Sequence, residues 1–212
     1  MSDGSQYDAD YFLRGKETGK SLYEDYRWMP EMTLPMCEAI IKHLGVKRGD
    51  SLLDFGCARG YTVRAMRDLG VCAFGYDVSL WAINNADIMA HRYLTGLHST
   101  AFSHKLAYDW VVAKDVLEHV PDLSSTTINI MEAARRGVFV VVPLGYGEDG
   151  YEVPEYDLDV THIHRLSLQT WAGKFMRPGW SVEARYRLCG VKDNYAGWPT
   201  GNGFVTCRRV EG

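Results

Sequence analysis

The sequence predicts an α/β fold built on a mostly parallel β-sheet, and three observations predict it. Apolar runs of strand length alternate with helical patterns between residues 51 and 143, which is typical of β-α-β units. A turn of small residues at 56–60 joins the first apolar run directly to a helical pattern. A last helical pattern and two strand-like runs follow over 166–209, which predicts a late antiparallel addition to the sheet.

Composition and charge indicate one globular domain. A chain of 212 residues buries a sizeable core, and 46% apolar with 24% charged residues is ordinary for such a domain. The net charge of -4 argues against a nucleic-acid partner, which needs a basic face. The five cysteines lack CxxC spacing, which favours reduced thiols in the cytoplasm. We find neither a signal-peptide pattern nor an apolar run long enough to span a membrane.

Residues 1–29 are expected to form an N-terminal arm ahead of a domain over 30–212. A short helix is predicted at 8–13 and a loop at 14–21. The arm is too rich in aromatic residues for a disordered tail: it holds Tyr7, Tyr11, Tyr23, Tyr26 and Trp28. Two interpretations stay open. The arm packs on its own domain or on the second subunit of a homodimer, or it is a lid over the substrate.

The elements of the domain follow in order. Pro30 opens a helix over 30–44, in which Met32 and Met36 are predicted to face the core and Gly45 to end the helix. The further predicted strands are 51–55, 74–77, 97–102, 109–115, 137–143, 180–188 and 204–209, and the further helices are 61–69, 79–86, 123–136 and 166–176, the last capped by Ser167.

A long connection over 144–165 separates the fifth predicted strand from the last helix. Between Glu148 and Asp159 it has six carboxylates and no basic residue. Long loops in compact domains often carry function. The segment is therefore either a solvated acidic surface loop or a wall of the substrate pocket.

Two carboxylates end neighbouring predicted strands. Asp54 lies near the end of the first strand, just before the small-residue turn, and Asp77 ends the second strand. A strand–turn–helix unit of this kind presents backbone N–H groups to a nucleotide-like ligand. A carboxylate about twenty residues further on is placed to accept hydrogen bonds from a ribose diol.

These residues resemble the class I S-adenosylmethionine-dependent methyltransferases, in particular their small-molecule branch. The first motif is matched by LLDFGCARG, from Leu52 to Gly60, and the second by Tyr76, Asp77 and Val78. The third is matched by DWVVAKDVLEHV over 109–120. The resemblance implies a Rossmann-like sheet of seven strands in the order 3-2-1-4-5-7-6, with strand 7 antiparallel and helices on both faces. It also implies S-adenosylmethionine at the carboxyl ends of strands 1, 2 and 4.

The resemblance assigns roles residue by residue. The methionine and ribose end of the cofactor would be lined by Asp54, Gly56, Cys57, Ala58 and Gly60. Asp77 would bind the ribose hydroxyls and Val78 the adenine, while Lys114, Asp115 and Val116 would lie near the sulfonium and the acceptor. Ala58 departs from the family's middle glycine, which argues against a dinucleotide, since a pyrophosphate needs close backbone approach there.

The function implied is methyl transfer to an oxygen or nitrogen of a small-molecule acceptor. His119 is the candidate general base because its ordinary pKa lies near neutrality. Asp115 is a competing base or an acceptor-orienting carboxylate. His162 and His164, one residue apart, could ligate a metal with Glu118 or His119, but two ligands at this spacing are a weak signal. A pocket wall or a structural hydrogen bond is the favoured interpretation, and no metal site is assigned. The alternatives are a non-catalytic S-adenosylmethionine-binding subunit and a nucleotide-binding oxidoreductase.

Overall fold

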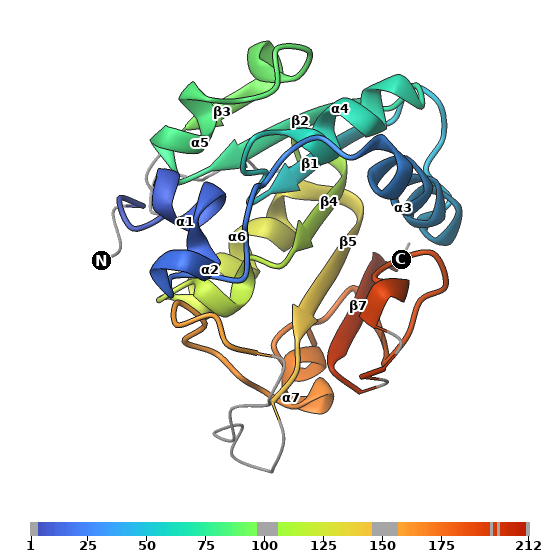
Figure 1. The fold of residues 1–212 in the computed structure, drawn as a ribbon. Coiled ribbons are helices and arrows are strands. Elements are labelled where there is room, and N and C mark those ends of the chain that lie inside the picture. Colours follow the sequence, from blue (N-terminus) through green and yellow to red (C-terminus); the bar gives the residue numbers. More distant parts are fainter. Residues whose placement is uncertain (1–3, 97–105, 146–156, 196, 199, 211–212) are drawn as a thin grey trace.

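A single seven-stranded sheet runs through the protein. The computed structural model describes residues 4–96, 106–145, 157–195, 197–198 and 200–210. The strands lie in the order β3-β2-β1-β4-β5-β7-β6 (Figure 1), and β7 is antiparallel to both β5 and β6. The predicted order and the antiparallel strand 7 are confirmed. The bounds are β1 Ser51–Phe55, β2 Cys72–Asp77, β3 Leu94–Gly96, β4 Tyr108–Lys114, β5 Ala134–Pro143, β6 Trp180–Arg185 and β7 Asn202–Arg209.

Successive residues of the central strands enter two different apolar layers. In β4, Trp110 and Val112 pack in one layer while Val111 packs in the other. The same alternation places Val140 and Val141 of β5 on opposite faces. A sheet buried on both faces needs apolar residues at every position, and this requirement explains the continuous apolar runs in the sequence.

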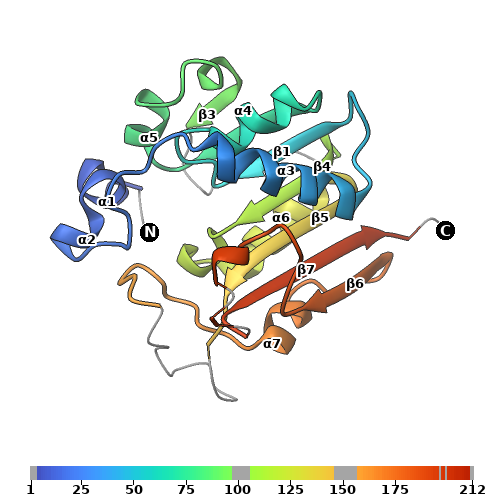
Figure 2. The same ribbon diagram turned by 45° about the vertical axis from the view of Figure 1, so that its right-hand side comes forward.

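Helices cover both faces of the sheet (Figure 2). One face is packed by α3 (Pro30–Leu44) and α4 (Tyr61–Asp68), and the other by α6 (Leu123–Ala133) and α7 (Leu168–Gly173). Pro30 occupies the first turn of α3, and Gly45 ends it in the left-handed conformation, as predicted. Ser167 caps α7 through its side chain, also as predicted. No helix among the described residues has the length and apolar character that a membrane crossing requires.

The helix predicted over 123–136 and the loop predicted over 14–21 are both wrong in part. The helix predicted over 123–136 ends at Ala133, because β5 already begins at Ala134. Its two arginines are good helix formers, yet Arg136 extends the strand and pairs with Asp50 instead. The predicted loop over 14–21 contains the short helix α2 (Gly15–Thr18). The strand predicted at 97–102 lies outside the described residues, and the third strand is β3.

The N-terminal arm packs on its own domain, next to α5 (Leu80–Asn84), which Ser79 caps (Figure 1). Its helix α1 (Ala9–Leu13) starts at the cap residue Asp8. The Phe12 ring stacks on Trp81 with centroids 5.6 Å apart, and Ser79 Oγ donates a 2.5 Å hydrogen bond to the Tyr7 carbonyl. The arm therefore lies over the carboxyl ends of the parallel strands.

Candidate active site

A cavity of about 600 Å³ opens at the carboxyl ends of β1, β2 and β4, beneath the arm. Such a position is where ligands enter open α/β sheets. The structure brings all but one of the predicted site residues to this cavity: Asp54, Gly56, Cys57, Ala58, Asp77, Val78, Lys114, Asp115, Val116 and His119. Gly60 is the exception. It begins α4 in the left-handed conformation, and a Cβ there would overlap Leu94 and Ala90 rather than the cavity.

The turn after β1 is shaped by backbone conformation. Gly56 has φ +82°, and a Cβ at this position would overlap Val116 in the loop after β4. Ala58 has φ +47°, a left-handed conformation that costs a non-glycine residue about 1–2 kcal/mol. Part of this cost is offset because the Ala58 N–H donates to Asp77 Oδ2 at 2.7 Å. Alanine therefore stands in a conformation that favours glycine.

Asp77 is buried at the tip of β2. Its second carboxylate oxygen accepts a 2.7 Å hydrogen bond from the Ser79 N–H. Burial raises its pKa, against the lowering effect of these backbone donors. Each carboxylate oxygen has about two acceptor sites, so capacity remains for two hydroxyl groups in the cavity that Asp77 lines.

Asp54 is buried one strand away, with 4% of its surface exposed. Burial raises its pKa to about 7, while the Lys114 ammonium acts in the opposite direction and the Asp77 carboxylate adds to the rise. A buried carboxylate of this kind is poised to take a cationic partner, because a positive group removes the cost of its ionisation.

Asp115 is held between two ammonium groups. Lys114 Nζ lies 2.6 Å from one of its oxygens and Lys192 Nζ lies 2.5 Å from the other. Burial opposes ionisation, but the two lysines outweigh it and hold the pKa of Asp115 well below its ordinary range. Asp115 is therefore a fixed anion of low basicity. Lys192 was missed from the sequence, since a lone lysine in a glycine-rich stretch carries no motif.

His119 is neutral across the physiological range. Burial, and then the nearby His162, lowers its pKa to about 4. Its Nδ1 lies 2.9 Å from Thr161 Oγ1 and 3.2 Å from the Thr161 carbonyl oxygen. The ring therefore offers the cavity a weakly basic imidazole whose orientation is fixed by residue 161.

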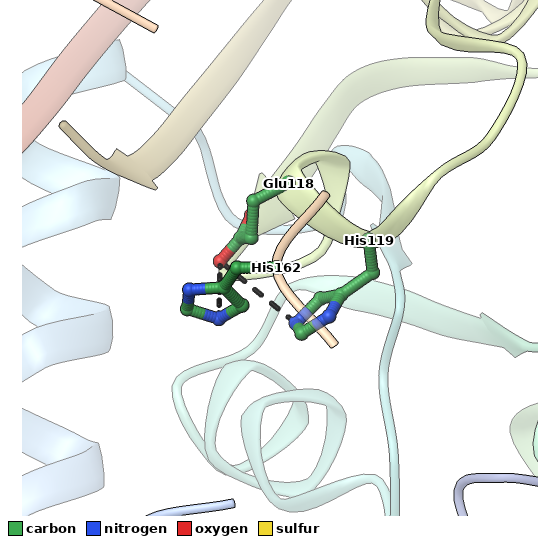
Figure 3. A group of neighbouring side chains, drawn as sticks. All are labelled: Glu118, His119 and His162. Atoms are coloured by element: carbon green, nitrogen blue, oxygen red, sulfur yellow. Dashed lines mark ion pairs between the residues drawn. The ribbon is translucent and has the colours of Figure 1, made fainter. Parts of the chain in front are cut away.

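Glu118 and His162 lie beside His119 (Figure 3). Glu118 is completely buried, and burial, followed by the charge of Asp115, raises its pKa to about 8. Asp157 and Asp159 are buried close by at 3% and 6% exposure. In the described part of the acidic connection these two carboxylates are therefore buried, and the chain after them is hydrogen-bonded to the Glu118 carbonyl.

Several lining residues were not predicted from the sequence. Met32 lines the cavity instead of facing the core and is 48% exposed, whereas Met36 packs against the core as predicted and lines the cavity as well. Helical spacing could not separate the core-facing side of α3 from its cavity-facing side, since both sides carry apolar residues. The arm adds Tyr7, Tyr11, Phe12, Tyr23 and Tyr26, whose aromatic excess was the available signal.

Comparison with known proteins identifies the domain. A family model described as a methyltransferase domain matches residues 31–184, more than half of the chain. No curated protein sequence matches.

Three solved structures are similar in fold. A chain of the complex between the Haloferax volcanii Trm112 methyltransferase activator and the putative methyltransferase has a TM-score of 0.68 at 14% identity, covering 98% of each chain. The plantazolicin methyltransferase BpumL, in complex with a triazolic desmethylPZN analogue and SAH, has a TM-score of 0.69 at 14% identity, covering 99% of this chain and 95% of that one. The [4+2]-cyclase SpnF has a TM-score of 0.64 at 14% identity, covering 84% and 81%. At these identities the likeness shows the fold alone.

Proposed function

This chain belongs to the class I S-adenosylmethionine-dependent methyltransferase family, and we propose that it transfers a methyl group to an oxygen or nitrogen of a small-molecule acceptor. The observation that carries the proposal is one shared cavity. Two buried carboxylates, Asp54 and Asp77, line it from the tips of neighbouring strands. S-adenosylmethionine, the family's cofactor, supplies a methyl group on a positively charged sulfur.

The residues present fit this cofactor. Asp77 retains acceptor capacity for the ribose hydroxyls, and Val78 beside it provides an apolar contact for adenine. Asp54 is the buried carboxylate that a cationic amino group would stabilise. The turn with Ala58 has no pyrophosphate to accommodate. We assign Gly56 and Cys57 to the wall of the methionine end.

The chain's contribution to chemistry is mainly positioning and exclusion of water. Tyr7, Tyr11 and Phe12 cover the cavity from the arm, which supports a lid as the arm's role. His119 and Asp115 both line the side next to Lys114. We assign His119 to hydrogen bonding and proton acceptance from the acceptor, and Asp115, whose basicity is low, to orienting it.

Calorimetry with S-adenosylmethionine, S-adenosylhomocysteine and NADH tests the proposal. We expect binding of both adenosyl ligands and none of NADH. NADH binding without adenosyl binding would instead support the oxidoreductase alternative. Adenosyl binding without turnover across a panel of acceptors, assayed with a labelled methyl donor, would support a non-catalytic binding subunit.

The Asp77→Ala variant tests the ribose assignment. Removing the carboxylate leaves the ribose hydroxyls without acceptors, and we expect S-adenosylhomocysteine affinity to fall by about 1–3 kcal/mol. The control is Asp68→Ala, which removes an exposed carboxylate at the end of α4. Equal affinity in the two variants would place the ribose elsewhere.

A further inference from the structure

Three metal-binding side chains converge beside the cavity (Figure 3). Glu118 Oε1 lies 4.0 Å from His119 Nε2 and 3.8 Å from His162 Nε2. The ligand atoms of all three residues lie within 4.8 Å of one another. Glu118 and His119 come from the short helix after β4, Leu117–His119, and His162 comes from the connection after β5.

The hydrogen bonds of His119 determine which ring nitrogen is free. The Thr161 hydroxyl donates to Asp159 Oδ1 at 2.6 Å. Because its hydrogen is used there, Thr161 Oγ1 can only accept a hydrogen bond from His119 Nδ1, and the Thr161 carbonyl oxygen is an acceptor in any case. The hydrogen of the neutral ring is consequently on Nδ1. The lone pair is on Nε2, the nitrogen that faces Glu118.

His162 lies against a second carboxylate. Its Nδ1 is in direct contact with Asp157 Oδ1, and Arg165 holds the other oxygen of Asp157 at 2.7 Å. The Nε2 atom of His162 is again directed at Glu118. A histidine that uses one ring nitrogen on a carboxylate or a carbonyl group and presents the other to a shared point is the usual arrangement of a metal ligand.

Glu118 is the unexplained member of the cluster. It is completely buried, yet neither carboxylate oxygen has a hydrogen-bond partner among the described residues. A buried polar group without a partner is costly. The charge of Lys192 acts on Glu118, but its ammonium group is engaged by Asp115 and Asn202. A cation between Glu118 and the two histidines would satisfy the carboxylate.

We propose that Glu118, His119 and His162 bind one divalent first-row transition-metal ion, for which Zn²⁺ is the best match. Two imidazoles and one carboxylate with an open fourth position form a known catalytic zinc arrangement. Ligand atoms bound at about 2.1 Å in tetrahedral geometry lie about 3.4 Å apart. Side-chain rotations that move the donor atoms by roughly an ångström bring the three donors to that spacing. His119 also lines the cavity, so the open position faces it.

The consequence for the acceptor rests on the proposed function. A metal ion at this point binds an acceptor oxygen and lowers the pKa of its hydroxyl group. With the ion bound, the Nε2 lone pair of His119 would serve as a ligand and could not also accept a proton from the acceptor. The ion itself would then acidify a bound hydroxyl group, so the metal-loaded site would favour hydroxyl acceptors.

Titration of the chelator-treated full-length protein with Co²⁺, followed by visible absorption, tests the site. We expect one equivalent to bind, with the intense bands of a four-coordinate ion, and Zn²⁺ to displace it. Glu118→Gln and His162→Gln should each weaken Co²⁺ binding at least about tenfold. The matched control is His164→Gln, which removes an imidazole two positions away but keeps a side-chain N–H for the Val120 carbonyl. It should bind Co²⁺ like the wild type.

Nitrogen NMR of labelled histidines keeps the test independent of variant folding. On addition of Zn²⁺ to the wild type, the Nε2 resonances of two histidines should shift while their Nδ1 resonances remain protonated. The site would be overturned if no stoichiometric Co²⁺ complex formed, or if the wild type and the three variants bound Co²⁺ equally. Unshifted histidine Nε2 resonances would overturn it as well. S-adenosylhomocysteine binding is measured on the metal-free protein, so failure of the methyltransferase proposal is recorded separately.

Discussion

At the residue scale, Gly56 and Val116 approach each other closely in the wall of the cavity. Gly56→Ala should lose more than about 2 kcal/mol of unfolding free energy, because left-handed backbone strain adds to the overlap with Val116. Its S-adenosylhomocysteine affinity should also fall. Urea denaturation and calorimetry measure both quantities.

Gly45→Ala is the matched control for this substitution. Gly45 has a similar φ of +74°, but a Cβ there meets nothing within 4 Å. The Gly45→Ala variant should lose only the part of the unfolding free energy that comes from backbone strain, about 1–2 kcal/mol. Its ligand affinity should be unchanged. Identical losses in both variants would show that the Val116 contact has no consequence.

The raised pKa of Asp54 makes ligand binding depend on pH. In the free protein its carboxyl is protonated below about pH 7, because burial outweighs the attraction of Lys114. A bound ammonium group favours the carboxylate, so binding below pH 7 releases a proton. Affinity should rise from pH 5.5 to about 7, by up to about tenfold per pH unit, and level off above it. Calorimetry in buffers of different ionisation enthalpy measures the release. Asp54→Asn should bind weakly with a flat profile, and a flat wild-type profile would contradict the assignment.

The raised pKa of Asp54 also makes the stability of the ligand-free protein depend on pH, and here the effect is a loss as pH rises. The native state keeps the Asp54 proton up to about pH 7 while the unfolded chain loses it near its ordinary pKa, so this group's contribution to stability falls as pH rises through that interval. The ligand-free Asp54→Asn variant should therefore be more stable than the wild type at pH 8, by up to about 4 kcal/mol. Asp68→Asn, at an exposed position, should show no such gain in thermal unfolding at pH 8.

Which residues could be foreseen depends on how local their signal is. Asp54 and Asp77 were predictable because each ends a strand and parallel strands end at one edge. The second lysine beside Asp115 was not, since Lys192 reaches it across 77 positions of sequence. No short-range pattern encodes contacts of that length.

At the scale of elements, strand pairing decided the boundaries that propensity could not. Arg135 and Arg136 suit a helix, but the pairing of Tyr108 with Ala134 starts β5 before them. The connection after β5 shows the same limit. Its acidic composition is visible in the sequence, whereas the burial of Asp157 and Asp159 depends on contacts with the segment after β4.

The arm is the element most open to a direct test. Phe12 is buried against Trp81, Tyr23 and Tyr26. Phe12→Ala should therefore detach the arm, so that trypsin can cleave the unfolded backbone after Lys16 and Lys20, whose side chains are already accessible. The sheet lies outside this cluster, so the main thermal transition should move little. S-adenosylhomocysteine should slow wild-type cleavage, because the arm lines its cavity.

Leu22→Ala provides the comparison within the same arm. Leu22 is 46% exposed, and its truncation should leave the rate of trypsin cleavage near that of the wild type. Two results would argue that the arm is a packing element rather than a lid. In the first, trypsin cleaves Phe12→Ala no faster than Leu22→Ala; in the second, S-adenosylhomocysteine does not slow cleavage of the wild type.

At the scale of the whole molecule, one sheet separates two apolar layers that should unfold together. Ile40 of α3 and Ile130 of α6 are both fully buried, in the layers on opposite faces. Each Ile→Ala substitution should cost about 2–5 kcal/mol. Because the sheet lies between them, the double variant should lose the sum to within about 0.5 kcal/mol.

Cooperativity follows from the strands that the two layers share. Neighbouring residues such as Val140 and Val141 of β5 enter opposite layers, so neither layer can be lost while the other keeps its sheet. Urea transitions followed by tryptophan fluorescence and by circular dichroism should therefore coincide in the wild type and in both single variants. If Ile40→Ala instead shifts the fluorescence transition away from the dichroism transition, the layer that contains α3 and α4 unfolds on its own. The shared strands would then not couple the two layers.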